Sequence, residues 1–439
     1  MTLEQKLESL ERDVLRHVVG KDRLAVVKAP PGSGKTSLLI KAALHGLAKK
    51  MRIAVGAQTN SQADDACNRL AQQGAAPVRF TSSSYDPPDL HPSATQISDK
   101  NVLPHDECIV IGTIAKWGSI ELLESFDLLI VDEAWQMAWA SFMPCGQVAE
   151  RFVLIGDPGQ IPPVVTVDTS RWETAPRPPH RPAPEIVVAS QAKAAKFELP
   201  GSRRLPHDTV EYVRGFYDFS FDAWANPAER KLATKKKGNG DGIDVAIDLM
   251  DKGSIALLTL PTPAHGPPLE LDEGLSKTAV AVAERLLSRG ASITIADDKR
   301  NPNERKLEPE DIGIVATHRI VNADIELRLP TALHGRVRVD TPERWQGLER
   351  AVMIAVHPLS GVTDPTSFDL ETGRLCVMAS RHKVALFMLA RDHIVPTLDI
   401  YIPSADQALG CADVTGKGHA RHLGFLEALA KRSRIVELR

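Results

Sequence analysis

Short, nearly continuous apolar runs separated by helical patterns are the feature that most restricts the fold of this chain. In the first half such runs lie at 23–29, 52–57, 108–113, 126–131 and 151–156, with a helical pattern over 36–50. Strands that are apolar on both faces and alternate with helices are typical of a parallel sheet covered on both sides. The first half therefore predicts an α/β unit.

The same alternation returns in the second half of the chain. Apolar runs lie at 255–260, 311–317, 336–340, 351–356 and 384–389, and a helical pattern covers 276–288. These runs predict a second α/β unit for the same reason.

Three segments interrupt these patterns. The proline-rich stretch 174–185 cannot form regular helix or central strand, so we expect a loop or linker there. The segment 229–242 is basic and glycine-rich, and we expect a mobile surface loop that is a solvated charge run rather than a nucleic-acid contact. Residues 401–439 are expected to form a C-terminal tail with one helix over 419–432.

The composition restricts the class of protein only loosely. The chain has 439 residues, 43% of them apolar, which is ample for two or three domains. Its five cysteines form no C-x-x-C pair, as expected in a reducing, cytoplasmic compartment. The charged N-terminus lacks the apolar core of a signal peptide, and no apolar run approaches the roughly 18 residues of a membrane span, so we expect no membrane contact. A net charge of −3 leaves room for a local basic channel.

The stretch 29–36, A-P-P-G-S-G-K-T, follows an apolar run and precedes a helical pattern. In that context backbone N–H groups and a helix N-terminus can hold phosphates, the lysine can reach the β- and γ-phosphates, and the threonine can bind Mg²⁺. Alanine replaces the usual first glycine, and a small residue can suffice there. The alternative is a chance turn. The candidate nucleotide-binding residues are Gly32, Ser33, Gly34, Lys35 and Thr36.

Two further elements carry polar residues directly after apolar runs. The run ending at Val131 is followed by Asp132, a candidate Mg²⁺ ligand, and Glu133, a candidate base that polarises the attacking water. The run ending at Gly156 is followed by a turn that carries Gln160, a candidate γ-phosphate sensor. Buried strands often end in acidic residues, and the glutamine turn also fits a simple Gly/Pro loop. The phosphate loop upstream favours the functional interpretation.

Taken in order, these motifs resemble the superfamily 1 helicases, most closely the up-frameshift-type branch in a compact core form. The resemblance covers about residues 23 to 391. Its elements are the phosphate loop, T59-N60-S-Q-A-D64, D132-E-A-W135, G156-D-P-G-Q-I-P-P163, S202-R-R-L205, I314-V-A-T-H318, V339 to E349, and R374 to K383.

The resemblance implies two tandem RecA-like P-loop domains with parallel sheets that hold ATP and Mg²⁺ between them. We expect a first domain at 1–200, a second at 201–400 and the tail at 401–439. In the second domain Arg204 and Arg381 would be arginine fingers, each worth about 10³ to 10⁵ in rate. The resemblance also implies that Gln160 senses the γ-phosphate and that Gly347 and Glu349 lie near the nucleotide.

The resemblance further places a single strand of nucleic acid on both domains. Short hydroxyl and amide side chains would contact its phosphates without reading sequence, although any one threonine fits a turn equally well. Trp135 and Trp345 could stack on bases, but we favour packing in the core or at a domain interface. The sequence does not separate DNA from RNA, and of the two we favour DNA. The expected contacts are Thr59, Asn60, Thr113, Thr317, His318 and Thr341.

Two departures from the family pattern bear on the nucleotide. Arg203 stands where the family usually has an aromatic residue that stacks on adenine, and the adenine-reading glutamine is missing, its place falling near Arg12. We therefore expect GTP and other nucleoside triphosphates to be hydrolysed nearly as well as ATP. The chain also lacks room for large accessory insertions, so it would translocate better than it unwinds.

The sequence thus predicts an ATP hydrolase that is stimulated by nucleic acid and acts as a helicase or translocase on single strands, in the 5′ to 3′ sense that the branch implies. A second hypothesis is an NTP-dependent switch or regulatory subunit that binds nucleic acid or a partner, which the tail could recruit, without unwinding. A third, a small-molecule kinase, is disfavoured because such an enzyme needs no second set of glutamine and arginine elements.

Overall fold

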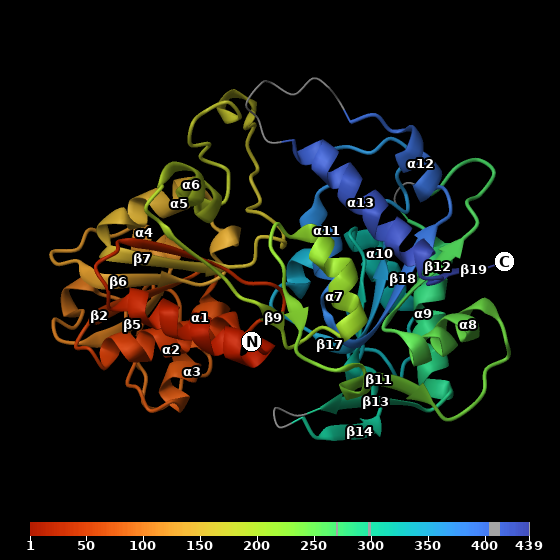
Figure 1. The fold of residues 1–439 in the computed structure, drawn as a ribbon, viewed down its shortest axis with the longest axis horizontal. Helices are drawn as coiled ribbons and strands as arrows, with labels where there is room; N and C mark the ends of the chain where they lie inside the picture. The colour runs from red at the N-terminus through yellow and green to blue at the C-terminus, as the bar shows by residue number, and fades with distance from the viewer. Residues whose placement is uncertain (269–270, 297–299, 404–412, 439) are drawn as a thin grey trace. The chain divides into compact units, whose positions relative to one another are not determined.

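A computed structural model describes residues 1–268, 271–296, 300–403 and 413–438 (Figure 1). The chain forms two compact units. The first contains Met1–Pro158 and Pro162–Gly201, and the second contains Gly159–Ile161 and the chain from Ser202 onward. Each unit has a parallel sheet with helices on both faces, so the predicted α/β fold with two parallel sheets is confirmed.

The sheet of the first unit has the strand order β4-β3-β5-β2-β6-β7-β1-β8, and its neighbouring strands are parallel. Strand β7 lies between β1 and β6, so these two strands end at the same edge of the sheet. The strands are β1 (Leu24–Lys28), β2 (Arg52–Ala57), β3 (Val78–Phe80), β4 (Thr95–Ile97), β5 (Cys108–Thr113), β6 (Phe126–Val131), β7 (Ala149–Gly156) and β8 (Ala195–Glu198).

Helices cover both faces of this sheet because its central strands are apolar on both sides. Helix α2 packs against α1 and α3, and α5 packs against α4 and α6 (Figure 1). The proline-rich loop expected over 174–185 is shorter than predicted, because its last three residues form the first turn of α6, where Pro184 is tolerated. The helices are α1 (Leu3–Val18), α2 (Lys35–Leu47), α3 (Asn60–Gln72), α4 (Ile114–Gly118), α5 (Trp139–Phe142) and α6 (Ala183–Ser190).

The main sheet of the second unit is parallel, in the order β16-β15-β17-β18-β12-β19. A three-stranded antiparallel sheet, β11-β13-β14, contributes Leu232 and Ile293 to the core on one face. The strands are β11 (Arg230–Thr234), β12 (Ile255–Leu260), β13 (Ala291–Ala296), β14 (Pro302–Lys306), β15 (Ile312–Val315), β16 (Arg338–Asp340), β17 (Arg350–Val356), β18 (His382–Arg391) and β19 (Ile435–Glu437), with the short pair β9 (Gly201–Ser202) and β10 (Asp222–Ala223).

Helix α9 packs against α8, α10 and the main sheet, whereas α7, α11 and α13 pack together on a second core cluster. The helices of this unit are α7 (His207–Val213), α8 (Gly242–Asp248), α9 (Glu273–Ser288), α10 (Arg319–Arg328), α11 (Thr372–Ala379), α12 (Ile394–Ile400) and α13 (Val414–Lys431).

The segment 229–242 differs from the mobile loop that we expected. Residues 230–234 form β11, which pairs with β13, and Leu232 points into the core at 2% exposure. The lysines that follow are held as well, because the N–H groups of Lys235 and Lys236 donate to the carbonyl of Arg289. This strand was not predicted because its local pattern is mostly charged. It is stabilised by pairing with β13, which lies about sixty residues further along the chain.

The C-terminal residues also differ from a separate tail. Helix α13 buries Phe425, Leu426 and Leu429 in the second unit, and β19 adds a parallel edge strand beside β12. The expected helix over 419–432 is thus part of a longer core helix. Residues 404–412 of the expected tail, which include Cys411, lie outside the described residues.

The four described cysteines, Cys67, Cys108, Cys145 and Cys376, are free and buried. Burial raises the pKa of the Cys145 thiol to about 12, as expected for a packing residue rather than a reactive one. No helix among the described residues combines the length and apolar character needed to cross a bilayer.

Candidate nucleotide and nucleic-acid sites

The phosphate loop joins β1 to α2 in the first unit. Ala29 is buried, its N–H donates to the carbonyl of Gly156 at 2.9 Å, and its φ is not positive, so alanine is accommodated without strain. Gly32 and Gly34 have φ values of 67° and 90°, which glycine adopts most readily. Gly34 is the N-cap of α2, and the loop therefore leads directly into a helix N-terminus. Free N–H groups at such an end suit phosphate.

The lysine of this loop meets the acidic pair that follows β6. Lys35 Nζ lies 3.1 Å from Glu133 Oε1, and both side chains are largely buried. Burial and the Glu133 carboxylate raise the pKa of Asp132, while the Lys35 ammonium opposes that rise. The structure therefore brings Lys35, Asp132 and Glu133 together. Thr36 follows Lys35 in the first turn of α2, and the Ser33 hydroxyl is buried in the loop.

Glu133 has an unusual backbone conformation. Its φ and ψ are 47° and 43°, the left-handed region, where a residue with a side chain is held at a cost of order 1 kcal/mol. Its N–H donates to Asp132 Oδ1 at 2.9 Å, and the Asp132 N–H donates to the carbonyl of Gly56. These bonds hold the backbone of the sharp turn at the acidic pair.

In the second unit, Arg204 and Glu349 come together although they are 145 residues apart. Arg204 Nε donates to Glu349 Oε2 at 2.6 Å, and Lys383 Nζ lies 2.5 Å from Glu349 Oε1. Burial alone would raise the pKa of Glu349, but the two cations outweigh it and lower that pKa to about 2. Glu349 thus sets the position of the arginine expected as a finger. Lys383 is the last residue of the element R374 to K383, but nothing in the sequence indicated that it pairs with Glu349.

The other residues expected near the nucleotide are Arg203, Gly347, Arg381 and Gln160, and each has different surroundings. The exposed Arg203 places its guanidinium 4.6 Å from the ring centroid of Trp224, so it already stacks on an aromatic ring of its own unit. Gly347 has a φ of 77° and needs glycine's freedom. Arg381 is buried between α11 and β18. Gln160 is buried too, with its backbone against Gly373 of α11.

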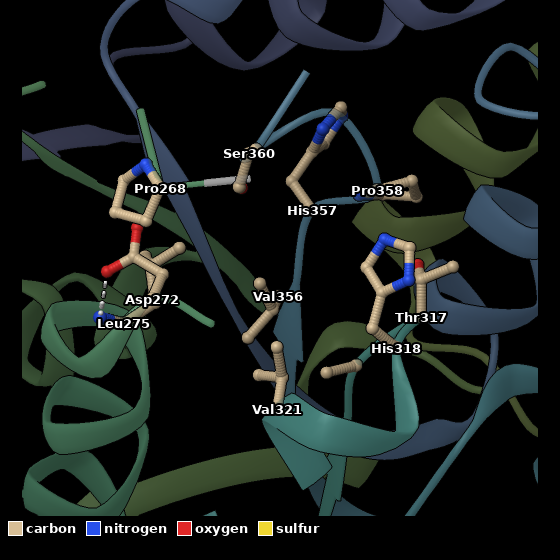
Figure 2. Close-up of a pocket in the computed structure, with 12 residues that line it drawn as sticks. Pro268, Asp272, Leu275, Thr317, His318, Val321, Val356, His357, Pro358 and Ser360 are labelled. Carbon is tan, nitrogen blue, oxygen red and sulfur yellow. Dashed lines mark hydrogen bonds between the residues drawn. The ribbon is translucent and has the colours of Figure 1, made fainter. Parts of the chain in front are cut away.

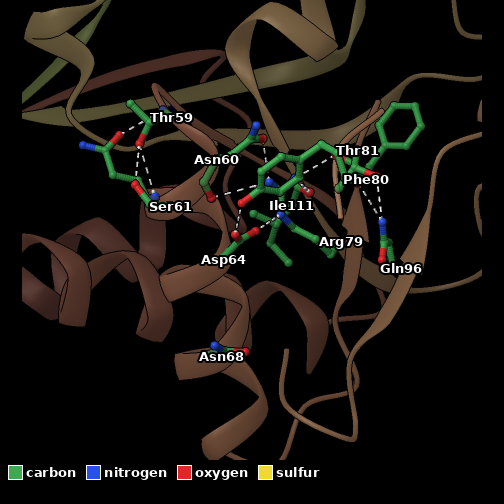
Figure 3. A network of polar contacts seen from close by, with 12 residues as sticks. Thr59, Asn60, Ser61, Asp64, Asn68, Arg79, Phe80, Thr81, Gln96 and Ile111 are labelled. Carbon is green, nitrogen blue, oxygen red and sulfur yellow. Dashed lines mark hydrogen bonds and ion pairs between the residues drawn. The ribbon is translucent and has the colours of Figure 1, made fainter. Parts of the chain in front are cut away.

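The expected strand contacts of the first unit lie at the ends of β2 and β5. Thr59 is the N-cap of α3 and Thr113 that of α4, so both hydroxyls accept backbone N–H groups. Asn60 is held differently, because Arg79 donates to Asn60 Oδ1 at 2.9 Å (Figure 3). Arg79 is fully buried, and its Nε donates to Asp64 Oδ1 at 2.6 Å.

The same arginine also reaches β5. Arg79 donates to the carbonyl of Ile111 at 3.4 Å, and the Tyr85 hydroxyl donates to Asp64 Oδ2 at 2.6 Å. Figure 3 shows Arg79, Asp64 and Ile111 close to the start of α3. Arg79 therefore joins two of the elements expected to contact the strand. The sequence did not single it out, because an arginine within a short strand reads as an exposed charge.

In the second unit the expected strand contacts follow β15 and β16. His318 is exposed and precedes α10, whereas the Thr317 hydroxyl is buried. Thr341 begins a short 3-10 helix, and its N–H donates to Asp340 Oδ1 at 3.0 Å. The structure therefore places Thr317 and His318 side by side and Thr341 on a neighbouring strand end.

The two tryptophans are packing residues in this structure, as we favoured. Trp345 is fully buried and its Nε1 donates to the carbonyl of Ile314 at 3.2 Å. A Cβ at Gly313 would lie 2.4 Å from the Trp345 ring, so glycine is needed beneath it. Trp135 is also buried, in the core of the first unit.

Comparison with known proteins agrees with these motifs. Residues 94–168, which contain the acidic pair and Gln160, match the family described as AAA domain. The DNA replication ATP-dependent helicase/nuclease dna2 of Schizosaccharomyces pombe is 28% identical over 156 residues, covering 33% of this chain and 11% of that protein. The corresponding enzyme JHS1 of Arabidopsis thaliana is 25% identical over 175 residues, covering 38% of this chain and 13% of that protein.

Among solved structures, the arterivirus nonstructural protein 10 (helicase) matches with a TM-score of 0.44 and 15% identity, covering 87% of this chain and 61% of that one. Its complex with DNA gives a TM-score of 0.43 and 14% identity over 87% of this chain and 63% of that one. These scores are too low to add to the assignment. The sequence matches are to helicases, and they agree with the resemblance of the ordered motifs to the superfamily 1 helicases. The chain spans only about a tenth of the length of these curated relatives.

Proposed function

We propose that this protein is a nucleic-acid-dependent NTPase that uses hydrolysis to move along single strands. The ion pair between Lys35 and Glu133 carries the proposal, because it joins the phosphate loop to the acidic pair within one unit. A lysine that neutralises phosphate charge and a carboxylate that accepts a proton from water are the groups that phosphoryl transfer to water requires.

The same residues suit Mg²⁺ bound together with a triphosphate. No group of three or more His, Cys, Asp or Glu side chains in the described ranges could hold a metal by itself. Mg²⁺ needs fewer protein ligands, because it usually binds one or two carboxylates together with substrate phosphates. Thr36 and Asp132 would supply a hydroxyl and a carboxylate, and the ion would neutralise charge on the phosphates. The raised pKa of Asp132 indicates a carboxylate that a nearby cation would stabilise.

The roles of the second unit are part of the same proposal. Arg204 and Arg381 would stabilise charge on the transferred phosphate, and Gln160 would report its presence. The ion pair with Glu349 supports this for Arg204, since it orients the guanidinium in advance. Gly347 and Arg203 would lie near the nucleotide, with Arg203 stacking on the base. Stacking by a guanidinium discriminates poorly among bases, so the site would accept other nucleoside triphosphates besides ATP.

The nucleic acid is proposed to be single-stranded, with DNA favoured over RNA because both curated relatives are named as DNA replication enzymes. Its contacts would be Thr59, Asn60 and Thr113 in one unit and Thr317, His318 and Thr341 in the other. The free thiols fit a reducing compartment such as the cytoplasm.

Hydrolysis of ATP and GTP, measured with and without single-stranded DNA or RNA, tests the proposal. We expect stimulation by at least one polymer, and loss of turnover in Lys35→Ala. Lys41→Ala is the matched control, because Lys41 lies on the same helix and pairs with Glu11 at an exposed position. Slow turnover that no polymer stimulates would favour the switch hypothesis instead.

A further inference from the structure

Two residues expected at ligand sites of the second unit differ in what can reach them. Thr317 lines a cavity at the carboxyl ends of β15 and β17, together with His357 and Ser360 (Figure 2). The volume of this cavity, about 30 Å³, leaves room only for water. Arg203, by contrast, follows β9 with an exposed side chain, so a larger ligand can reach its guanidinium.

The short strands β9 and β10 bring Arg203 close to Trp224. Arg203 follows β9 and the half-buried Trp224 follows β10, and the Trp224 N–H donates to the carbonyl of Ser202 at 2.8 Å. The Arg203 guanidinium lies 4.6 Å from the centroid of the Trp224 ring. This distance is that of a cation–π contact, in which the positive group is attracted to the face of the ring.

Other bonds anchor the two segments that form this contact. Arg230 Nη2 donates to the carbonyl of Arg203 at 2.9 Å. The carbonyl of Trp224 accepts Arg300 Nη2 at 3.3 Å, and the Arg300 guanidinium lies 5.5 Å from the same ring centroid. Arg300 is in turn paired with Glu229 at 3.6 Å. The backbone on both sides of the contact is therefore already held in place.

The contact with Trp224 changes what Arg203 offers to a ligand. An exposed arginine samples many rotamers, and a ligand that stacks on it must bear the cost of fixing the side chain. The Trp224 ring lowers this cost, because it holds the guanidinium before any ligand binds. A guanidinium is planar and stacks on aromatic faces, so the side of Arg203 away from Trp224 suits a nucleobase.

We propose that Trp224 is a positioning residue for the base of the bound triphosphate, which stacks on Arg203 while Trp224 holds the guanidinium from behind. This role rests on the proposed function, in which Arg203 stacks on the base, and it belongs to a residue outside the motifs. Arg204, the next residue, donates to Glu349 Oε2 at 2.6 Å, so the stack is fixed beside the proposed arginine finger. Because stacking uses the faces of the base, adenine and guanine should be held equally well.

The test is isothermal titration calorimetry of the full chain with the non-hydrolysable analogues AMP-PNP and GMP-PNP and with inorganic triphosphate, which has no base. The variants are Trp224→Ala, Trp224→Phe, Arg203→Ala and the double variant Arg203→Ala with Trp224→Ala. Trp172→Ala is the matched control, because the Arg171 guanidinium lies 4.1 Å from the Trp172 ring in the first unit. Thermal unfolding verifies that each variant is folded, and Trp224→Phe carries the test if the alanine variant does not fold.

We expect Trp224→Ala to bind both analogues roughly three- to tenfold more weakly, which corresponds to the cost of immobilising one long side chain. Its affinity for inorganic triphosphate should be unchanged, because the stack contacts only the base. Trp224→Phe should lose less, since a smaller aromatic ring still attracts a cation. In the Arg203→Ala background Trp224→Ala should have no further effect, because Trp224 acts through Arg203. Trp172→Ala should bind as the wild type does.

Three outcomes would overturn this role of Trp224 and leave the proposed function intact. They are unchanged affinity for both analogues in the folded Trp224 variants, an equal loss for inorganic triphosphate, and a further loss in the Arg203→Ala background. The second would make Trp224 a purely structural residue, and the third would mean that its ring contacts the base directly. If the wild type binds none of the three probes, the proposed function fails, and the role of Trp224 fails with it.

Discussion

Replacing Glu133 by Gln should separate nucleotide binding from hydrolysis. Glu133 is the proposed acceptor of the water proton, so its loss should lower turnover at least about 100-fold. Its carboxylate also neutralises Lys35 at 3.1 Å, and a bound triphosphate would compete for that ammonium. The amide side chain has nearly the same volume but no charge. The variant should therefore bind nucleotide more tightly while hydrolysing it far more slowly.

The size of the affinity change follows from the distance between the two charges. Two unit charges at 3.1 Å attract by about 5 kcal/mol at an effective dielectric constant of about 20, and by about 1.3 kcal/mol in water. Part of the larger value is offset by the hydration that both groups regain. The lower value therefore sets the smallest expected gain, about tenfold in nucleotide affinity.

Titration with a fluorescent ATP analogue gives the affinity, and phosphate release gives the turnover. Glu107→Gln is the matched control, because Glu107 also pairs with a lysine, Lys50 at 2.5 Å, but at an exposed position. That variant should match the wild type in both assays. Weaker nucleotide binding in Glu133→Gln, or turnover near the wild-type rate, would refute the roles assigned to this pair.

Three further predictions follow from other contacts. Because Arg203 stands in place of an adenine-stacking aromatic residue in our proposal, GTP should be hydrolysed at nearly the rate of ATP. A profile restricted to ATP would contradict this. In urea unfolding, Arg79→Met should lower the free energy of unfolding by about 3–5 kcal/mol, since it leaves the Asp64 carboxylate buried without its cation. The control Arg69→Met removes an exposed ion pair and should lower that free energy by less than about 0.5 kcal/mol. Equal losses in the two variants would refute this reasoning. Burial lowers the pKa of His382 to about 3, so the unfolded chain binds one more proton between pH about 6.5 and 3. The free energy of unfolding should then fall with falling pH in that window, with a contribution from His382 of up to about 1.4 kcal/mol per pH unit. In denaturation series from pH 7 to 4, the contribution of His382 to this pH dependence should be absent in His382→Gln.

The main strands and the long helices were predictable because their patterns are local. A buried parallel strand needs a continuous apolar run, and each run in the sequence became a strand within a few residues of its expected ends. The antiparallel sheet was not predicted, because its strands depend on pairing between distant segments rather than on a local pattern. Strands β11 and β14 carry mostly polar residues, and pairing with β13 rather than composition makes them strands.

The motifs of the candidate site could also be recognised in the sequence. The phosphate loop, the acidic pair after β6 and the arginine elements could be recognised because their spacing along the chain is fixed. The supporting residues Lys383 and Arg79 could not be recognised, since they have no local signature. Each acts through a neighbour that the fold brings to it.

The sequence by itself determined the order of the motifs, the α/β class and the residue types available for nucleotide chemistry. The tertiary structure decided which charges meet. It paired Lys35 with Glu133 because β7 lies between β1 and β6, and it held Arg204 on Glu349 across 145 residues of chain. Local preferences act within a few residues, whereas ion pairs and pockets depend on which strands become neighbours in the sheet.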